Sequence, residues 1–295
     1  MLAEKLLACL ACPACGGGPL RLDTERSAEE TIVEGSLGCP ECKRWYRVVD
    51  DIPRLMPPGL ASNLRAGDEH WSEWREAMLD FLQWREDAWS DEQAAAERRS
   101  AALALHEQFL EFCALPDGPF DCLDIGAGAG QLSDLIGGDC TYVGIDPLPG
   151  GRAPGGDLPP HMPRASRPVS LVQAVGEVLP FARSSFDVVL MLGSLDHTCR
   201  PDEAIAEAAR VLRDGGTLCI LQGKSSRRSC GIGGALRSVV SGIGGGRKVS
   251  ARDTHLHRFG LKELEALVSE RFVVAACSEE ADRIFLRAIS QSPEA

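Results

Sequence analysis

The stretch that decides the fold is LDIGAGAG, residues 123–130, in which three alternating glycines directly follow a short apolar run. Glycines permit the tight turn between a buried strand and a following helix. A strand, a turn and a helix are therefore predicted here, in that order. Asp146 ends the next apolar run, 20 positions after Gly126. An acid about 20 residues beyond such a turn can accept hydrogen bonds from both hydroxyls of a ribose. The third glycine comes too early for a pyrophosphate-binding turn, so the pattern favours another adenosine-bearing ligand.

Short apolar runs alternate with helical patterns outward from this turn. The predicted strands cover 120–125, 141–145, 169–174, 186–191 and 217–221, followed later by 271–277 and 283–289. Helices are predicted over 201–212 and 261–270. Strands that alternate with helices predict a mostly parallel sheet with helices on both faces, so the fold class is α/β.

Three further motifs follow the glycine turn in a fixed order. They are GEVLPF at 176–181, SFDVV at 185–189 and ARVLRDGGTL at 209–218. Together with the turn, they resemble class I S-adenosylmethionine-dependent methyltransferases of the type 11 group, over roughly residues 120 to 222. The resemblance implies a seven-stranded, mostly parallel Rossmann-like sheet and an enzyme that transfers a methyl group from S-adenosylmethionine.

The resemblance also implies a cofactor site. Its residues are Asp124, Gly126, Ala127, Gly128, Gly130, Asp146, Gly176, Glu177 and Leu192. The glycines would pass under the methionyl group, Asp124 would hold the turn and the ligand amine, and Asp146 would bind the ribose. Val175 stands where the family has an acid for the adenine amino group, which leaves that contact to the backbone near Gly176 or absent. Glu177 matches an acidic position of the family, and a helix-capping or surface role is an equal alternative.

Four polar side chains are candidates for removing a proton from the methyl acceptor: Asp196, His197, His255 and His257. Asp196 and His197 follow the fourth strand of the sheet, and open α/β sheets bind ligands at the carboxyl ends of their strands. Imidazole is suited to proton removal near neutral pH. The alternative is that His197 packs or caps the helix after Pro201, and that the other two histidines lie on a loop surface.

The chain contains 12 cysteines, and four of them form two C-x-x-C pairs. Cys12 with Cys15 and Cys39 with Cys42 would present four thiolates to one tetrahedral zinc ion. Four protein ligands leave no open position, so the predicted zinc is structural. Chance spacing or a redox pair is the alternative. Cys9 sits on the preceding apolar helix and is left out of the site.

The segments around these pairs, LLACLACPAC at 6–15 and YRVVDDIPRL at 46–55, resemble the zinc-ribbon subunits that activate methyltransferases. The resemblance covers about the first 57 residues and departs at Arg47, where that family usually has proline. It implies a module that stabilises or activates a methyltransferase, supplied here within the same chain.

Composition suggests three parts: a zinc ribbon at 1–60, a helical linker or cap at 61–115, and a methyltransferase domain at 116–295. The cap is predicted from an apolar stripe (Trp71, Trp74, Met78, Phe81 and Trp84) and from a helical run at 94–113. Residues 147–168 contain seven prolines and four glycines, which exclude the helix that the family places there. A solvated loop is expected instead, with part of the substrate mouth as the alternative. Residues 224–258 are predicted to be an insertion that covers the substrate, and a flexible, solvated Gly/Ser loop over 224–250 is the alternative.

Charge limits the partners that we expect. The chain has 31 basic and 43 acidic side chains, a net charge of −12, yet residues 223–295 have 12 basic and 8 acidic. Broad contact with nucleic acid is therefore disfavoured, and any anionic partner should meet the C-terminal part. A small-molecule acceptor is predicted, such as an anionic metabolite, a sugar or a lipid-linked intermediate. An rRNA or tRNA methyltransferase and a non-catalytic cofactor-binding module are the alternatives.

Location and association follow from the absence of certain patterns. No run approaches the ~18 to 20 apolar residues that span a membrane, and the first 15 residues lack a signal-peptide pattern. A cytoplasmic location is therefore expected, with membrane contact at most peripheral, through residues 232–243. The pattern does not set an oligomeric state.

Overall fold

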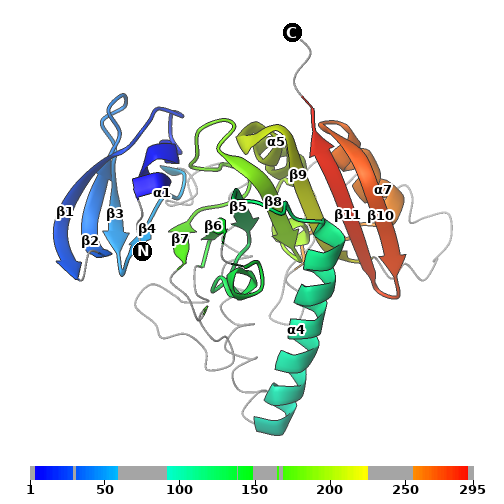
Figure 1. Ribbon diagram of the computed structural model, residues 1–295. Coiled ribbons are helices and arrows are strands. Elements are labelled where there is room, and N and C mark those ends of the chain that lie inside the picture. The colour runs from blue at the N-terminus through cyan, green and yellow to red at the C-terminus, as the bar shows by residue number, and fades with distance from the viewer. Residues whose placement is uncertain are drawn as a thin grey trace.

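Two β-sheets organise the protein, and both are seen in Figure 1. The computed structural model describes residues 4–28, 31–58, 92–137, 139–148, 165, 169–224 and 255–291. Within these residues, a four-stranded antiparallel sheet has the order β1-β2-β3-β4, and a seven-stranded sheet has the order β10-β11-β9-β8-β5-β6-β7. The first sheet belongs to the N-terminal ribbon, and the second is the body of the molecule.

The bounds of the elements follow the chain. The small sheet and its leading helix comprise α1 (Glu4–Cys9), β1 (Arg21–Ala28), β2 (Thr31–Gly38), β3 (Trp45–Val49) and β4 (Ile52–Pro53). The large sheet comprises β5 (Phe120–Ile125), β6 (Cys140–Asp146), β7 (Ser170–Gln173), β8 (Phe186–Leu192), β9 (Leu212–Gly223), β10 (Phe272–Glu280) and β11 (Arg283–Ser290). The helices around it are α4 (Glu92–Cys113), α5 (Pro201–Val211) and α7 (Leu261–Ser269), with short 3-10 helices η1 (Gln131–Asp134) and η3 (Leu195–His197).

The large sheet confirms the predicted fold class. Strand β5 pairs in parallel with β6 and β8, and the parallel ladders continue to β7 and β9. Strand β11 is antiparallel to both of its neighbours, so it is the one reversed strand among the seven. Five of the six residues of β5 are buried, because both faces of the sheet are covered.

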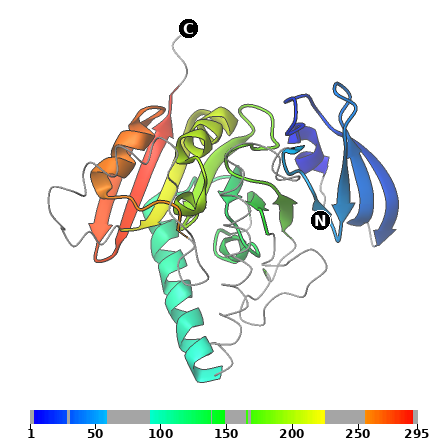
Figure 2. The ribbon, with the colours of Figure 1, turned by 180° about the vertical axis from the view of Figure 1, so that it is seen from behind.

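Helices lie on opposite faces of the sheet, as the two opposite views in Figures 1 and 2 show. Helix α5 begins with Pro201 and buries an apolar stripe: Ala204, Ile205, Ala208 and Val211. This stripe packs with Leu264 of α7 in one cluster. On the other face, Phe109 and Cys113 of α4 pack against Cys122, Val188, Cys219 and Phe285. The predicted helices at 94–113, 201–212 and 261–270 are confirmed.

The prediction of a helix directly after the glycine turn is wrong. The chain there makes only the 3-10 helix η1, four residues long. Only nine residues separate Gly130 from the start of β6, and Gly137, with a φ of 84°, ends the turn that follows η1. A segment this short returns to the sheet before an α-helix of ordinary length can form.

The ribbon is joined to the edge of the large sheet. Arg54, just after β4, pairs in parallel with Gln173 of β7, and the Leu55 amide donates to the Gln173 carbonyl at 2.9 Å. A second ladder pairs Leu10 with Phe181, and the Ala11 amide donates to the Pro180 carbonyl at 2.9 Å. Figure 1 shows the ribbon beside β7.

The ribbon and the large sheet also share one hydrophobic core. Leu6, Leu10 and Leu55 of the ribbon are buried in the same cluster as Val172 and Phe181 of the methyltransferase-like part. Burial across this joint stabilises both parts together, because neither apolar surface faces water. The ribbon is therefore part of the packing of the protein rather than a tethered appendage.

Several predictions fall on residues outside the described ranges. These are the tryptophan-rich stripe at 71–84, most of the proline-rich segment at 147–168, and the insertion at 224–258 apart from its two ends. Among the described residues, no helix combines the length and the apolar character that crossing a membrane requires.

Candidate functional site

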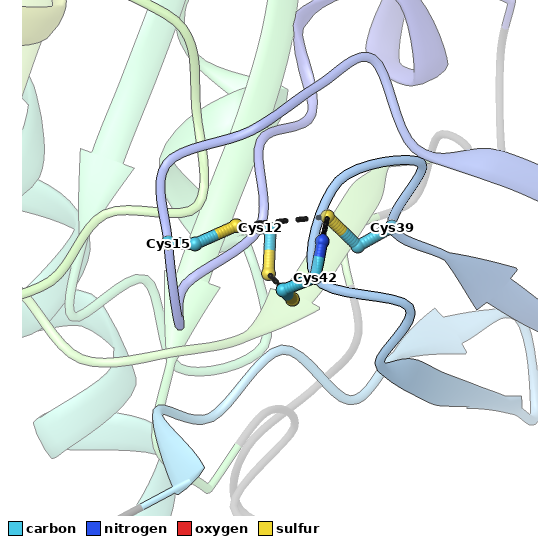
Figure 3. A group of neighbouring side chains, drawn as sticks. All are labelled: Cys12, Cys15, Cys39 and Cys42. Atoms are coloured by element: carbon cyan, nitrogen blue, oxygen red, sulfur yellow. Dashed lines mark hydrogen bonds between the residues drawn. The ribbon is translucent and has the colours of Figure 1, made fainter.

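The two cysteine pairs meet in the ribbon, as Figure 3 shows. The four sulfur atoms all lie within 4.8 Å of one another. Cys12 Sγ is 3.6 Å from Cys42 Sγ, and Cys15 Sγ is 3.7 Å from Cys39 Sγ. A tetrahedral zinc with Zn–S bonds of about 2.3 Å separates its sulfur ligands by about 3.8 Å. The four thiols therefore fit a zinc ion.

One of the chain's two tyrosines supports this cysteine cluster. The Tyr46 hydroxyl lies 3.1 Å from Cys12 Sγ, and both side chains are buried. Burial raises the pKa of Tyr46 well above its usual value, so the hydroxyl keeps its proton and can donate to the sulfur. Such a bond orients a thiolate ligand.

The glycine turn at the end of β5 has a left-handed backbone. Gly126, Gly128 and Gly130 have φ values of 84°, 56° and 80°. The Gly126 amide donates to the Ile145 carbonyl at 2.8 Å, which ties the turn to β6. A Cβ on Gly126 would lie 2.3 Å from the Cβ of Ser194, so only glycine fits beside this residue.

Asp146 faces the same turn from the end of β6. Its Oδ2 accepts from the Gly128 amide at 3.0 Å, and its Oδ1 accepts from the Leu148 amide at 2.7 Å. Burial raises the pKa of Asp146, while these two amides oppose the shift. A carboxylate oxygen can accept more than one hydrogen bond, so both oxygens still have acceptor capacity for a ribose.

Asp124 lies deeper, within the sheet. Its side chain is 2% exposed, and Oδ2 accepts a hydrogen bond from the Tyr142 hydroxyl at 2.5 Å. Burial raises the pKa of Asp124 to about 7, the Tyr142 bond opposes the rise and the charge of Asp146 adds to it. The hydroxyls of both tyrosines thus contact candidate site residues, Tyr46 at Cys12 and Tyr142 at Asp124.

The remaining cofactor candidates lie around the same edge. Gly176 approaches Ile125 of β5, where a Cβ would be 3.1 Å from the Ile125 Cγ2. Ala127 is buried beside the turn, and Leu192 ends β8 half-buried. Glu177 Oε1 accepts from the Cys199 amide at 2.7 Å and the Arg200 amide at 3.4 Å, just before α5. These bonds fix the loop that leads into α5, and the role of Glu177 at the cofactor stays a prediction.

Three of the four candidate bases come together at the carboxyl end of β8. Asp196 Oδ1 lies 3.8 Å from His197 Nε2, and Asp196 Oδ2 lies 3.5 Å from His255 Nε2. The two imidazole rings stack with centroids 4.7 Å apart. Asp196 is buried, whereas 42% of the His255 side chain is exposed. We call Asp196, His197 and His255 the Asp-His cluster.

Backbone bonds bring His255 to Asp196, although the two residues are 59 positions apart in the chain. The amides of Leu256 and His257 both donate to the Asp196 carbonyl, at 2.8 and 3.0 Å. The His257 ring is not part of this group of ligand atoms within 4.8 Å, and its Nε2 is 3.4 Å from the Cys199 carbonyl oxygen. Burial lowers the pKa of His257, which favours its neutral form.

Comparison with known families matches two segments of the chain. Residues 123–220 match the family described as "Methyltransferase domain", and residues 4–51 match the family described as "Trm112p-like protein". The chain joins a Trm112p-like domain to a methyltransferase domain. Both resemblances seen in the sequence are confirmed, and the fold is that of S-adenosylmethionine-dependent methyltransferases.

Curated relatives of the methyltransferase domain include mycobacterial proteins. An uncharacterised methyltransferase of Mycobacterium marinum is 38% identical over 95 residues, 32% of this chain and 35% of that protein. An uncharacterised protein of Mycobacterium bovis is 31% identical over 134 residues, 45% of this chain and 41% of that protein. The chain thus spans about a third to two fifths of the length of these relatives.

Solved structures with a similar fold include two methyltransferase systems. One is a chain of a complex that contains the Haloferax volcanii Trm112 methyltransferase activator, with 14% identity and a TM-score of 0.49, covering 72% of this chain and 99% of that one. The other is 1,6-didemethyltoxoflavin-N1-methyltransferase of Burkholderia thailandensis, with 20% identity and a TM-score of 0.49, covering 86% of this chain and 98% of that one.

Sequence reasoning missed two residues that support the methyltransferase domain. Tyr142 lies one step diagonally from Asp124 across the β5–β6 ladder, where Asp124 pairs with Gly144 and Cys122 pairs with Tyr142. The sequence did offer a signal for Tyr142: a buried acid needs a hydrogen-bond partner, and a tyrosine in the neighbouring predicted strand can supply one. Gln173 connects Arg54 of the Trm112p-like domain to Pro147 at the end of β6, and no local pattern points to it.

Proposed function

We propose that this protein transfers the methyl group of S-adenosylmethionine to a small-molecule acceptor. The observation that carries the proposal is a shared edge: the glycine turn, Asp146 and the Asp-His cluster all lie at the carboxyl ends of β5, β6 and β8. Open α/β sheets bind ligands at this edge. Ser194 connects the Asp-His cluster to the glycine turn, because its hydroxyl donates to the Ile125 carbonyl at 2.6 Å.

The cofactor would be held by the turn at Gly126 to Gly130 and by Asp146. Glycines have no side chain to block a close approach to the backbone, and the Asp146 carboxylate would accept from the ribose hydroxyls. When bound, S-adenosylmethionine supplies an electrophilic methyl group on a sulfonium. The protein then needs to align the acceptor and accept its proton.

The Asp-His cluster would accept the proton of the methyl acceptor. His255 is partly exposed, so the methyl acceptor can reach its ring. The carboxylate of the buried Asp196 lies 3.5 Å from the Nε2 of this ring. The Asp196 carboxylate would orient the ring toward the proton of the methyl acceptor, as the third group of a base arrangement does.

The Trm112p-like domain would stabilise the cofactor edge as a built-in activating module. Arg54 Nη1 donates to Gln173 Oε1 at 3.4 Å, and Gln173 Nε2 donates to the Pro147 carbonyl at 3.0 Å. Pro147 directly follows Asp146, so one side chain connects the ribbon to the ribose-binding strand end. A structural zinc at the four cysteines would hold the ribbon in the shape that presents Arg54.

The wider assignments are part of the same proposal. The division into a ribbon at 1–60, a helical cap at 61–115 and a methyltransferase domain at 116–295 is inferred from composition, as is a cytoplasmic location. A small acceptor is favoured over RNA because the first 115 residues have 12 basic and 21 acidic side chains. Basic surface is the usual requirement for RNA contact.

Cofactor binding is tested by calorimetric titration of S-adenosylmethionine. Asp146→Ala removes the carboxylate at the glycine turn, and we expect the Kd to rise about 10- to 100-fold, the range for a lost hydrogen bond to a charged group. Asp139→Ala, at an exposed position just before β6, is the matched control and should leave the Kd unchanged. Equal affinity in both variants would contradict the site.

The acceptor class is tested with S-adenosylmethionine labelled in its methyl group. The protein is incubated separately with a small-molecule extract and with total RNA, and each fraction is then analysed by mass spectrometry. We expect label in the small-molecule fraction. Label in RNA, with binding that falls steeply as salt rises, would replace this proposal with the RNA alternative. Cofactor binding without label in either fraction would favour the non-catalytic alternative.

A further inference from the structure

We propose that the Asp-His cluster is a second metal site, which binds one Zn²⁺ through a carboxylate oxygen of Asp196 and the Nε2 atoms of His197 and His255. This metal would receive an oxygen donor of the methyl acceptor in its open position. The part that concerns the acceptor rests on the proposed function, whereas metal binding does not.

The distances in the cluster fit a shared metal ion. One ligand atom from each of the three residues lies within 4.8 Å of the others. The Asp196 oxygens are 3.5 and 3.8 Å from the two imidazole nitrogens, longer than the usual N–H···O distance of about 2.7 to 3.2 Å. Ligands at about 2.1 Å around a tetrahedral zinc are about 3.4 Å apart, close to these separations. The two stacked imidazole rings would turn away from each other to aim both Nε2 atoms at one ion.

An independent observation concerns the buried carboxylate. Asp196 Oδ1 is buried and has no hydrogen-bond partner among the described residues. The Asp196 side chain is 6% exposed, so water does not readily compensate for the missing partner. An unpaired buried acceptor of this kind costs free energy, and a cation between it and the two imidazoles would satisfy it.

The ligand set differs from that of the ribbon. Four thiolates close a structural site, whereas two histidines and one carboxylate leave a position for a further ligand, as in catalytic zinc sites. The open position would face solvent on the side of His255, whose side chain is 42% exposed, while Asp196 closes the buried side. Thus the two zinc sites would serve different purposes within one chain.

An open metal site next to the cofactor edge points to an acceptor with a hydroxyl group. A bound divalent cation lowers the pKa of a hydroxyl that it contacts. In the transfer, the acceptor oxygen forms a bond to the methyl carbon, the bond from sulfur to that carbon breaks, and its electron pair stays on the sulfur of S-adenosylhomocysteine. With both Nε2 atoms bound to the metal, neither imidazole takes the proton, so the metal replaces His255 as the group that activates the hydroxyl, and the proton leaves to solvent.

The site is tested by metal content. The full chain is saturated with Zn²⁺, freed of unbound metal and analysed for zinc per chain. We expect about two Zn²⁺ for the native protein, and about one for His255→Gln, Asp196→Asn and Cys39→Ser. His257→Gln is the matched control, because its ring lies on the same segment but outside the cluster, and it should keep about two.

A second measurement covers the case in which a variant does not fold. Co²⁺ replaces Zn²⁺ in the native chain, and visible spectra are recorded as the metal is added. We expect thiolate-to-cobalt charge transfer from the cysteine site and, separately, weaker bands from a site with only nitrogen and oxygen ligands. A native protein that binds only the thiolate-type ion, or a His255→Gln variant that keeps about two zinc ions, would overturn the inference.

The two proposals fail in different ways. We expect His255→Gln to bind S-adenosylmethionine within about twofold of the native Kd, because the turn and Asp146 are unchanged. If the native protein binds the cofactor and transfers methyl groups but holds only the ribbon zinc, the metal inference alone is wrong. If it holds both metals but does not bind S-adenosylmethionine, the proposed function is wrong and the metal site remains.

Discussion

The stability of this protein should depend on pH through the buried carboxyl of Asp124. Burial raises its pKa from 3.8 to about 7, so the folded state holds this proton more tightly than the unfolded chain does. The stabilising contribution of the protonated group is complete below pH 3.8 and is lost as the pH rises to about 7. A shift of this size corresponds to about 4 kcal/mol, at about 1.4 kcal/mol for each pKa unit.

Asp124→Asn removes this titration while keeping an oxygen that can accept from the Tyr142 hydroxyl. We expect the difference in unfolding free energy, variant minus native, to increase by about 4 kcal/mol between pH 4 and pH 8. Urea unfolding at a series of pH values, with zinc held constant and without S-adenosylmethionine, measures it.

The change of that difference with pH, rather than its value at one pH, tests the reasoning. Asp139→Asn makes the same chemical change at an exposed carboxyl and is the matched control. If the Asp124→Asn difference stays constant from pH 4 to pH 8, Asp124 does not titrate in this window, and its raised pKa is wrong.

Two further predictions concern packing. Gly126→Ala places a Cβ 2.3 Å from Ser194 at a φ of 84°, so we expect a loss of about 1 to 3 kcal/mol in unfolding free energy and weaker S-adenosylmethionine binding by calorimetry. Gly118→Ala, whose Cβ would meet nothing within 4 Å, should change neither. Leu55→Ala opens the joint between ribbon and sheet and should cost about 2 to 5 kcal/mol by urea unfolding. Leu103→Ala, at a side chain 47% exposed on α4, is its control; equal losses would contradict the shared core.

Local patterns determined much of the fold. The strand at 120–125 is observed with the predicted bounds, and α5 begins at Pro201 as the sequence indicates. The reason is physical: a strand buried on both faces needs a continuous apolar run, and a helix covering one face needs an apolar stripe. The two cysteine pairs are equally local, because two tight turns suffice to present four thiolates.

Other local predictions were wrong or incomplete because chain length and contacts over long distances decide them. The segment after Gly130 has helical composition, but it has too few residues before β6 to make more than η1. The charge state of Asp124 depends on its burial and on Tyr142, which follows it by 18 positions and reaches it across two paired strands.

The sequence alone was enough to predict the methyltransferase and Trm112p-like resemblances, the cysteine ligands and the glycine turn, because each depends on residues that are close together in the chain. Only the tertiary structure brought His255 to Asp196, 59 positions earlier in the chain, through two backbone bonds. It also placed Arg54 of the ribbon on Gln173 at the edge of the large sheet. Contacts of this kind depend on how sheet edges and loops meet in space, and no local pattern of residues encodes them.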